Sequence, residues 1–340
     1  MAITAPVLER LYAELPESRL SVWSGLPEDA LRGRIHCPFN LVEDPLDFGM
    51  RMNPDLTVDV ERTMNDYANL HRRWDEHLDQ RAERLRSSDC SLLLSNISFL
   101  NVAAAARAGI PVIALSPLNW ADLYRYYTPQ TKASTAVFRK MVDAYNCCDT
   151  FLAPRPCMPM HWVQNLEVIP PVAQTGHDHG ALIRERFGLG EETRLLLLAL
   201  GGREAELKPS ELPELENVRW LVDGSCGLQR YDILHLNETG LMFPDLLASS
   251  DVLVCKPGYG AFTEAACLGK PVLYMRRPDW PEEVHLIEWL EKQIPCREAR
   301  LNDASGLRRA IVRFLSLAAT KRCQPAGIEV CVQRIRSLLK

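Results

Sequence analysis

The chain has 340 residues, of which 47% are hydrophobic and 24% are charged, and its net charge is −5. This length suits two domains with sizeable cores, and the composition excludes a disordered or fibrous protein. The slightly acidic balance argues against a nucleic-acid partner. Since no apolar run reaches the ~18 residues that a membrane-spanning helix needs, we expect no transmembrane segment.

The eleven cysteines have neither a repeated short spacing nor a CxxC pair. A secreted disulfide framework or a structural zinc site would space them differently. The first residues also lack the basic segment and apolar run of a signal peptide. We therefore expect reduced thiols and a cytoplasmic protein.

The first half of the chain alternates short apolar strands with helices. Two strands flank an alanine-rich helix that ends at Gly109, a sequence typical of a βαβ unit and hence of a parallel sheet. The expected elements are, in chain order, a helix at 6–15, a strand at 19–23, one or two exposed helices within 60–86, and strands at 90–94 and 111–115.

No strand precedes the first of these helices. A doubly wound domain normally opens with a strand and a glycine-rich turn into its first helix. We therefore expect this sequence to lack the first strand and its loop, which would leave two strand edges unpaired in the sheet.

Prolines at 168–171 predict an extended connector to a second series of elements. The fold class predicted is α/β, with two doubly wound, Rossmann-like domains at 1–167 and 168–324 that face each other across a cleft. An amphipathic helix at 325–340 is expected to pack back on the first domain. The expected elements of the second domain are helices at 181–187, 243–249 and 261–268, and strands at 194–200, 219–222, 233–236, 251–255 and 271–275.

The most informative segment is a tight turn between the strand at 251–255 and the helix at 261–268. Its glycines would let backbone N–H groups approach a ligand, and the helix N-terminus carries partial positive charge, so we predict a diphosphate site. Glu264 is expected in the first helical turn, where a carboxylate can bind ribose hydroxyls. The alternative is a plain glycine-rich turn, because short glycine motifs often match by chance. The turn consists of Lys256, Pro257, Gly258, Tyr259 and Gly260.

Residues 251–271 read D-V-L-V-x-K-P-G-Y-G-x-x-x-E-A-x-x-x-G-K-P. This pattern resembles the donor-binding region of GT-B glycosyltransferases, including the family 28-type N-acetylglucosaminyl transferase and the UDP-glycosyltransferase superfamily. A later R-x-x-W-x-E is similar to a second motif of uncharacterised bacterial members. The resemblance implies a UDP-sugar as the donor, with the diphosphate at Gly258 and Gly260 and the ribose at Glu264. It places Arg277, Asp279, Glu282 and Glu283 on the donor side, the three acidic residues near the sugar.

The resemblance extends upstream. Gly201 and Gly202 match the family's strand-then-GG loop, which implies a second approach to the phosphates. Ser95-Asn96-Ile97 and residues 118–124 are similar to the N-terminal region of plant-type sugar kinases, which places Asn96, Asn119, Trp120 and Tyr124 on the acceptor side. Core packing is the alternative for the last two residues.

The general base of the family lies near a G-H-G-type loop that this sequence lacks. Asp122 is a remaining candidate, although a helix-terminal charge is the simpler explanation of this carboxylate. His177 and His179 lack a third ligand, and no DxD motif appears, so we expect no metal.

These patterns predict a glycosyltransferase that moves a sugar from a nucleoside diphosphate sugar to an unidentified acceptor without a cofactor. The turn glycines and the helix dipole would stabilise the departing diphosphate. The alternatives are a nucleotide-sugar epimerase or hydrolase on the same fold, and a non-catalytic nucleotide-sugar-binding protein.

Overall fold

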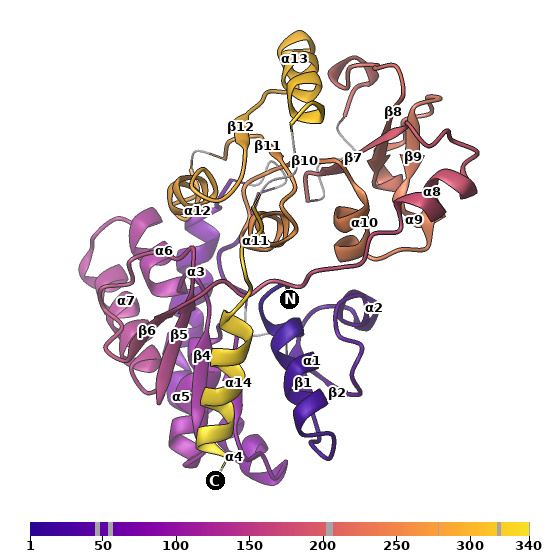
Figure 1. Ribbon diagram of the computed structural model, residues 1–340. Helices are drawn as coiled ribbons and strands as arrows, with labels where there is room; N and C mark the ends of the chain where they lie inside the picture. The colour runs from indigo at the N-terminus through magenta and orange to yellow at the C-terminus, as the bar shows by residue number, and fades with distance from the viewer. Residues whose placement is uncertain (45–47, 54–56, 202–206, 278, 318–320, 340) are drawn as a thin grey trace. The chain divides into compact units, whose positions relative to one another are not determined.

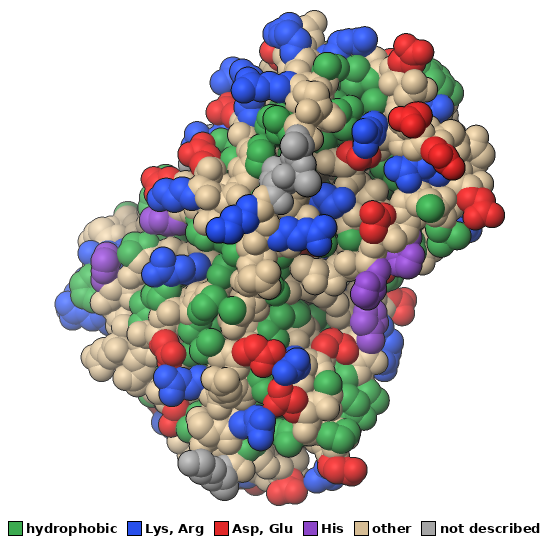
Figure 2. All heavy atoms as spheres, viewed as in Figure 1, with side chains coloured by type: hydrophobic (Ala, Val, Ile, Leu, Met, Phe, Trp, Pro, Cys, Tyr) green, Lys and Arg blue, Asp and Glu red, His purple; other side chains and the backbone are tan. Residues whose placement is uncertain are grey.

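The structure is a computed structural model that describes residues 1–44, 48–53, 57–201, 207–277, 279–317 and 321–339 (Figure 1). It divides into two compact units, one of Met1–Val172 with Ala326–Lys340 and one of Ala173–Pro325. No helix among the described residues is long and apolar enough to cross a membrane. Figure 2 shows one face of the molecule, on which basic and acidic side chains alternate with hydrophobic ones.

The first unit contains two parallel sheets. Strands β3-β4-β5-β6 form one sheet in that order, and β1 pairs with β2 in the other. The elements are α1 (Thr4–Glu14), β1 (Ser21–Ser24), α2 (Glu28–Arg32), β2 (Asn40–Glu43), α3 (Val60–Arg72), α4 (Trp74–Ser87), β3 (Leu93–Ser95), α5 (Phe99–Ala108), β4 (Val112–Leu115), α6 (Trp120–Tyr127), α7 (Lys132–Tyr145), β5 (Thr150–Pro154), β6 (Leu166–Ile169) and α14 (Gly327–Leu338).

Each sheet of the first unit has two outer strands, β1 and β2 in one and β3 and β6 in the other, and each of these lacks a partner strand on one side among the described residues. β1 pairs only with β2, and β3 pairs only with β4. All four residues of β4 are buried, whereas Val22 and Trp23 of β1 and Leu93 and Leu94 of β3 are partly exposed. Because every open sheet has free edges, the expectation that a missing first strand leaves two edges unpaired stays a prediction.

An aromatic cluster in the core of the first unit is formed by side chains of helices α3, α4, α5 and α7. Trp74 stacks on Phe99 with ring centroids 5.9 Å apart, and Tyr145 meets the edge of Phe99 at 6.0 Å. His71 lies among these rings, where burial and, to a smaller extent, the charge of Lys140 lower its pKa to about 4. His71 is therefore a neutral core residue at pH 7.

A buried ion pair links the end of β2 to two helices. Arg81 of α4 donates from both terminal nitrogens to the carboxylate of Asp44, and the two side chains are only 5% and 3% exposed. Asn101 of α5 adds a hydrogen bond of 3.1 Å from Nδ2 to the same carboxylate. These bonds satisfy charges whose burial would otherwise be costly.

The C-terminal helix α14 belongs to the first unit, as the sequence predicts. It packs against α1, and its Cys331, Val332 and Ile335 are buried. Gly327 begins the helix by donating to Pro171 O at 3.0 Å. A Cβ on Gly327 would lie 2.2 Å from the backbone oxygen of Pro170, so only glycine fits this approach.

The second unit is one doubly wound sheet with the strand order β12-β11-β10-β7-β8-β9, all parallel. Its elements are α8 (Gly180–Arg186), β7 (Arg194–Ala199), β8 (Val218–Val222), β9 (Ile233–His235), α9 (Leu236–Thr239), α10 (Phe243–Ser249), β10 (Val252–Cys255), α11 (Tyr259–Leu268), β11 (Val272–Tyr274), α12 (Glu283–Leu290), β12 (Cys296–Glu298) and α13 (Ala304–Leu315).

The sequence places two boundaries incorrectly. The predicted connector at 168–171 begins inside β6, so the first unit continues to Val172 rather than ending at residue 167. Prolines 170 and 171 end the strand but do not prevent its pairing with β5. Helix α11 begins at Tyr259 rather than at residue 261, because Gly258 is already its N-cap.

We predict that Asp44→Ala lowers the free energy of unfolding by about 3–5 kcal/mol, because it leaves the Arg81 guanidinium buried without its partner. Chemical denaturation measures this loss. The double substitution Asp44→Ala/Arg81→Met should recover much of it. Arg19→Ala is the control, since the exposed Arg19–Asp89 pair at 3.4 Å should contribute less than about 1 kcal/mol. Equal losses for Asp44→Ala and Arg19→Ala would contradict the prediction.

Candidate functional site

The strand order of the second unit reverses between β7 and β10, which lie side by side with Ala199 paired to Cys255. Chains that leave two such strands turn to opposite sides, which opens a crevice at the carboxyl edge of a parallel sheet. Ligands of doubly wound proteins bind there. The predicted phosphate-binding turn follows β10 at this edge.

The structure brings the two predicted phosphate loops together. Gly201 follows β7 with a left-handed φ of +64°, and Lys256 follows β10. The Lys256 ammonium donates to Gly201 O at 3.4 Å, and a Cβ on Gly201 would lie 2.5 Å from Lys256 Nζ. A cation therefore lies directly beside both loops. Gly202 lies outside the described residues.

Gly258 is the N-cap of α11, which no side chain caps. Its φ of −163° is extended backbone that any residue adopts. A Cβ here would meet no atom of the described residues within 4 Å, so nothing in the part of the chain that the structure describes requires a glycine. The open space beside Gly258 would let a ligand reach the helix N-terminus, where backbone N–H groups and the helix dipole favour an anion. Pro257, Tyr259 and Gly260 complete the turn.

Glu264 requires a correction. The sequence places it in the first turn of its helix, but α11 starts two residues earlier, so Glu264 lies in the second turn. The residue is 0% exposed. The carboxylate is therefore buried in this structure, and its predicted contact with the ribose stays a prediction.

Glu283 holds the loop between β11 and α12 in shape. Its carboxylate accepts from Arg276 Nε and from the backbone N–H of Arg277, and the side chain is only 2% exposed. Arg277 in turn stacks on Trp280, with its guanidinium carbon 4.3 Å from the ring centroid. Both oxygens of Glu283 are bound within the loop, so the residue braces that loop, and its position near the donor sugar stays a prediction.

The neighbouring residue Glu282 has one carboxylate oxygen without a hydrogen-bond partner among the described residues. Its Oε2 accepts from Trp280 Nε1 at 3.0 Å, while Oε1 is buried without a hydrogen-bond partner among the described residues. Burial raises the pKa of this carboxyl to about 7, against the opposing effects of the Trp280 hydrogen bond and the Arg277 charge. A buried, unsatisfied oxygen of this kind can accept a hydrogen bond from a ligand hydroxyl. Asp279 lies exposed on the same loop.

The predicted acceptor-side residues are mostly structural. Tyr124 is 1% exposed and meets Tyr67 edge-on at 5.4 Å, so an aromatic platform at this residue is wrong. The Trp120 ring covers Gly49, where a Cβ would lie 2.8 Å from it. Asn119 caps α6 by accepting from Asp122 N at 2.8 Å. Asn96 donates to Leu115 O at 2.5 Å and so ties the segment after β3 to the end of β4.

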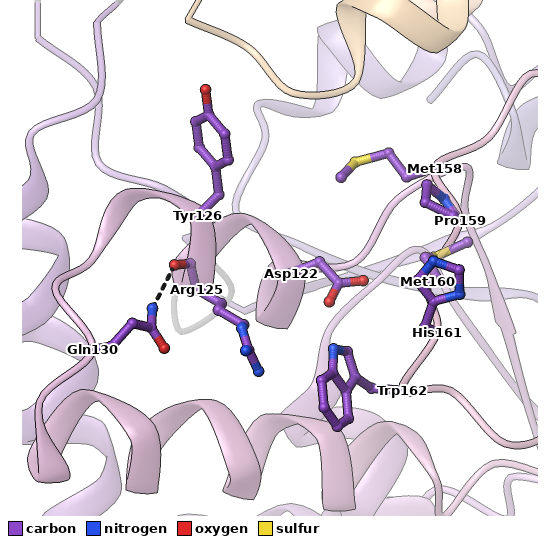
Figure 3. A pocket seen from close by; sticks show the side chains of 9 residues that line it. All are labelled: Asp122, Arg125, Tyr126, Gln130, Met158, Pro159, Met160, His161 and Trp162. Atoms are coloured by element: carbon purple, nitrogen blue, oxygen red, sulfur yellow. Dashed lines mark hydrogen bonds between the residues drawn. The ribbon is translucent and has the colours of Figure 1, made fainter.

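Asp122 lies at a cavity of about 480 Å³ in the first unit (Figure 3). Burial raises the pKa of its carboxyl, and a hydrogen bond from Asn119 Nδ2 at 2.8 Å opposes that shift. The sequence patterns do not predict the other lining residues, although His161 and Trp162 in the loop after β5 are residue types that often line ligand pockets. These are Arg125, Tyr126, Gln130, Met158, Pro159, Met160, His161 and Trp162.

No group of three or more histidine, cysteine, aspartate or glutamate side chains is placed to hold a metal ion within the part of the chain that the structure describes. The backbone N–H of His177 donates to Asp245 Oδ1 at 2.8 Å, and that of His179 donates to Ser249 Oγ at 2.8 Å. These bonds tie the histidine segment to α10 and give it a structural role.

No protein-family model matches the chain. The chain is 26% identical over 281 residues, 79% of its length, to L-arabinokinase of Arabidopsis thaliana, and it spans only 26% of that relative. Among solved structures, it is similar to the glycotransferase of kitacinnamycin, with 16% identity, a TM-score of 0.62, and coverage of 99% of this chain and 90% of the other. It is also similar to UGT71G1 of Medicago truncatula complexed with UDP-glucose, with 10% identity, a TM-score of 0.52, and coverage of 98% and 90%.

The two structural matches cover almost the whole chain and show its fold. The protein has the GT-B glycosyltransferase fold, with two doubly wound α/β domains. The resemblance that the sequence motifs predict is therefore confirmed at the level of the fold.

We predict that the free energy of unfolding falls by about 3 kcal/mol as the pH rises from about 4.5 to about 7, on account of Glu282. Its pKa is raised from an ordinary 4.5 to about 7, so the folded protein holds a proton that the unfolded chain releases. Stability from this group is thus present at low pH and is lost as the pH rises. Denaturant unfolding of Glu282→Gln across this range should lack that decline.

The matched control is Glu288→Gln, which changes an exposed residue of helix α12, the helix that follows Glu282. It should leave the pH dependence of the wild type unchanged. Parallel curves for Glu282→Gln and the wild type would show that the carboxyl ionises normally in the folded protein.

Proposed function

We propose that this protein transfers a sugar from a nucleoside diphosphate sugar, most simply a UDP-sugar, to an acceptor. The observation that supports this most directly is the paired loops at the β7/β10 switch point, with Lys256 beside Gly201 and open space at Gly258. The glycotransferase of kitacinnamycin and the UDP-glucose complex of UGT71G1 share this fold.

In this proposal, the diphosphate binds at the N-terminus of α11. The helix dipole, the N-terminal N–H groups and the Lys256 ammonium stabilise the negative charge that develops on the leaving group. A metal ion supplies that stabilisation in other transferases, and the proposed reaction here does without one. Charge stabilisation at the leaving group lowers the barrier because the charge grows towards the transition state.

The donor sugar would bind against the loop that holds Glu282. Its buried Oε1 gains a hydrogen bond only when a ligand hydroxyl reaches it, so a polyol satisfies an otherwise unpaired group. The Glu283–Arg276 brace keeps this loop in place. The same geometry would suit an epimerase or a hydrolase, and product analysis separates them because only a transferase requires an acceptor.

We place the protein in the cytosol. All eleven cysteines are free thiols, and burial raises the pKa of Cys148 to about 12. Unreactive, reduced thiols suit a reducing compartment.

The first test is isothermal titration calorimetry of UDP, GDP and ADP. We expect one of them to bind with a dissociation constant in the range of about 1–100 μM, and UDP is the best candidate. Gly258→Val should weaken that binding by about tenfold or more, because its side chain fills the space through which the phosphates approach the helix N-terminus.

Gly190→Val is the matched control. A Cβ at Gly190 also meets nothing within 4 Å, but this glycine lies in the loop between α8 and β7 at the opposite end of that strand from Gly201. It should leave nucleotide affinity unchanged. Equal binding by both variants, or no binding of any nucleotide by the folded wild type, would overturn the proposal.

A further inference from the structure

All the residues that line the cavity beside Asp122 belong to the first unit. Helix α6, which follows β4, forms one wall, and residues 158–162, which follow β5, form the other (Figure 3). Its volume of about 480 Å³ is in the range of small-molecule sites. Apolar methionine and proline side chains share the lining with a few polar groups, as in typical ligand pockets.

Two large aromatic side chains stay exposed at this cavity. Tyr126 is 61% exposed and Trp162 is 49% exposed, although both are costly to leave in water. Trp162 is held by Phe138, whose ring meets it edge-on at 5.6 Å. A fixed, exposed indole offers a flat surface on which a ring compound can lie.

Asp122 supplies a fixed hydrogen-bond acceptor. Its Oδ2 accepts from Asn119 Nδ2 at 2.8 Å, and its own backbone N–H donates to Asn119 Oδ1, so the residue is tied at two points. Figure 3 shows the carboxylate directed across the cavity towards His161. The second oxygen makes no hydrogen bond to any residue that the structure describes, so it remains available to a ligand hydroxyl.

Arg125 supplies an unpaired cation on the same helix. Its guanidinium carbon lies 5.0 Å from the ring centroids of both Phe138 and Trp162. Within the described ranges this guanidinium forms no ion pair and donates no hydrogen bond, unlike Arg107 and Arg51 in the same unit, which pair with aspartates. A guanidinium fixed by aromatic rings presents its N–H fork to a carboxylate or phosphate.

We propose that this cavity binds a small hydroxylated ring compound that carries one carboxylate or phosphate, such as a sugar acid or a sugar phosphate. The ring lies against Trp162, a hydroxyl donates to Asp122, and the anionic group meets Arg125. That this ligand is the acceptor of the transfer rests on the proposed function, whereas the binding itself does not.

The test uses the intact protein without nucleotide, so that it is independent of the donor site. Ligand-observed NMR titrations with glucose, glucuronate and glucose 6-phosphate compare a neutral ring with its two anionic forms. We expect at least one anionic form to bind about tenfold or more tightly than glucose, which corresponds to a charge-assisted hydrogen bond. The tighter of the two anionic forms identifies the carboxylate or the phosphate as the natural group.

Two variants assign the contacts. Arg125→Gln changes an exposed side chain, and it should abolish the preference for the anionic form while leaving glucose binding unchanged. Asp122→Asn should weaken all three ligands by a similar factor, with thermal unfolding showing that the variant folds. Arg139→Gln, an exposed arginine on the neighbouring helix α7, is the matched control and should change nothing.

Three results would overturn the proposal. These are equal affinity for glucose and both anionic forms, an anionic preference that survives Arg125→Gln, and no binding of any of the three ligands. Each is distinguishable from failure of the proposed transferase function, because nucleotide binding and its loss in Gly258→Val are measured separately.

Discussion

The parallel pairing of β7 with β10 is the constraint on which the rest of the second domain depends. Parallel strands end at the same edge of the sheet, so the loops that follow Ala199 and Cys255 must lie together. This adjacency places the Lys256 ammonium against Gly201, which has a left-handed backbone conformation. The N-terminus of α11, which follows β10, lies at the same edge of the sheet. The cation and the helix dipole then reinforce each other, because both favour an anion at one place.

The two buried carboxylates that follow β11 differ in their hydrogen bonding. Glu283 and Glu282 are adjacent and nearly equally buried, yet only Glu283 has partners for both oxygens. The satisfied carboxylate stabilises the loop, and the unsatisfied one carries a raised pKa of about 7. Burying a polar group without a partner is costly, so such a group commonly marks a place where a ligand completes the hydrogen bonds. The loop therefore contains both a brace and an unsatisfied polar oxygen.

The first domain meets a different constraint, because β1 and β3 each have one unpaired edge among the described residues. Packing and buried charge hold the unit together across this interruption. Asp44, at the end of β2, is joined to Arg81 and Asn101 on helices α4 and α5, which flank β3. Helix α14 packs against α1. These long-range contacts replace part of the backbone hydrogen bonding that a continuous sheet would supply.

The sequence by itself determined the α/β class, the alternation of strands and helices, the glycine turn between β10 and α11 and the return of the C-terminal helix, because periodicity, glycines and helix caps are local signals. It did not indicate β2 or β12, which are short and partly polar and become strands only by pairing with neighbours, and it did not indicate β5. Only the tertiary structure decided the roles of particular side chains. From local sequence, Tyr124 was predicted to offer an aromatic surface to the acceptor and Glu264 to bind the ribose, but both side chains are buried in the folded protein. The same packing leaves Trp162 exposed beside Asp122, because residues distant in sequence meet only when the strands between them are paired.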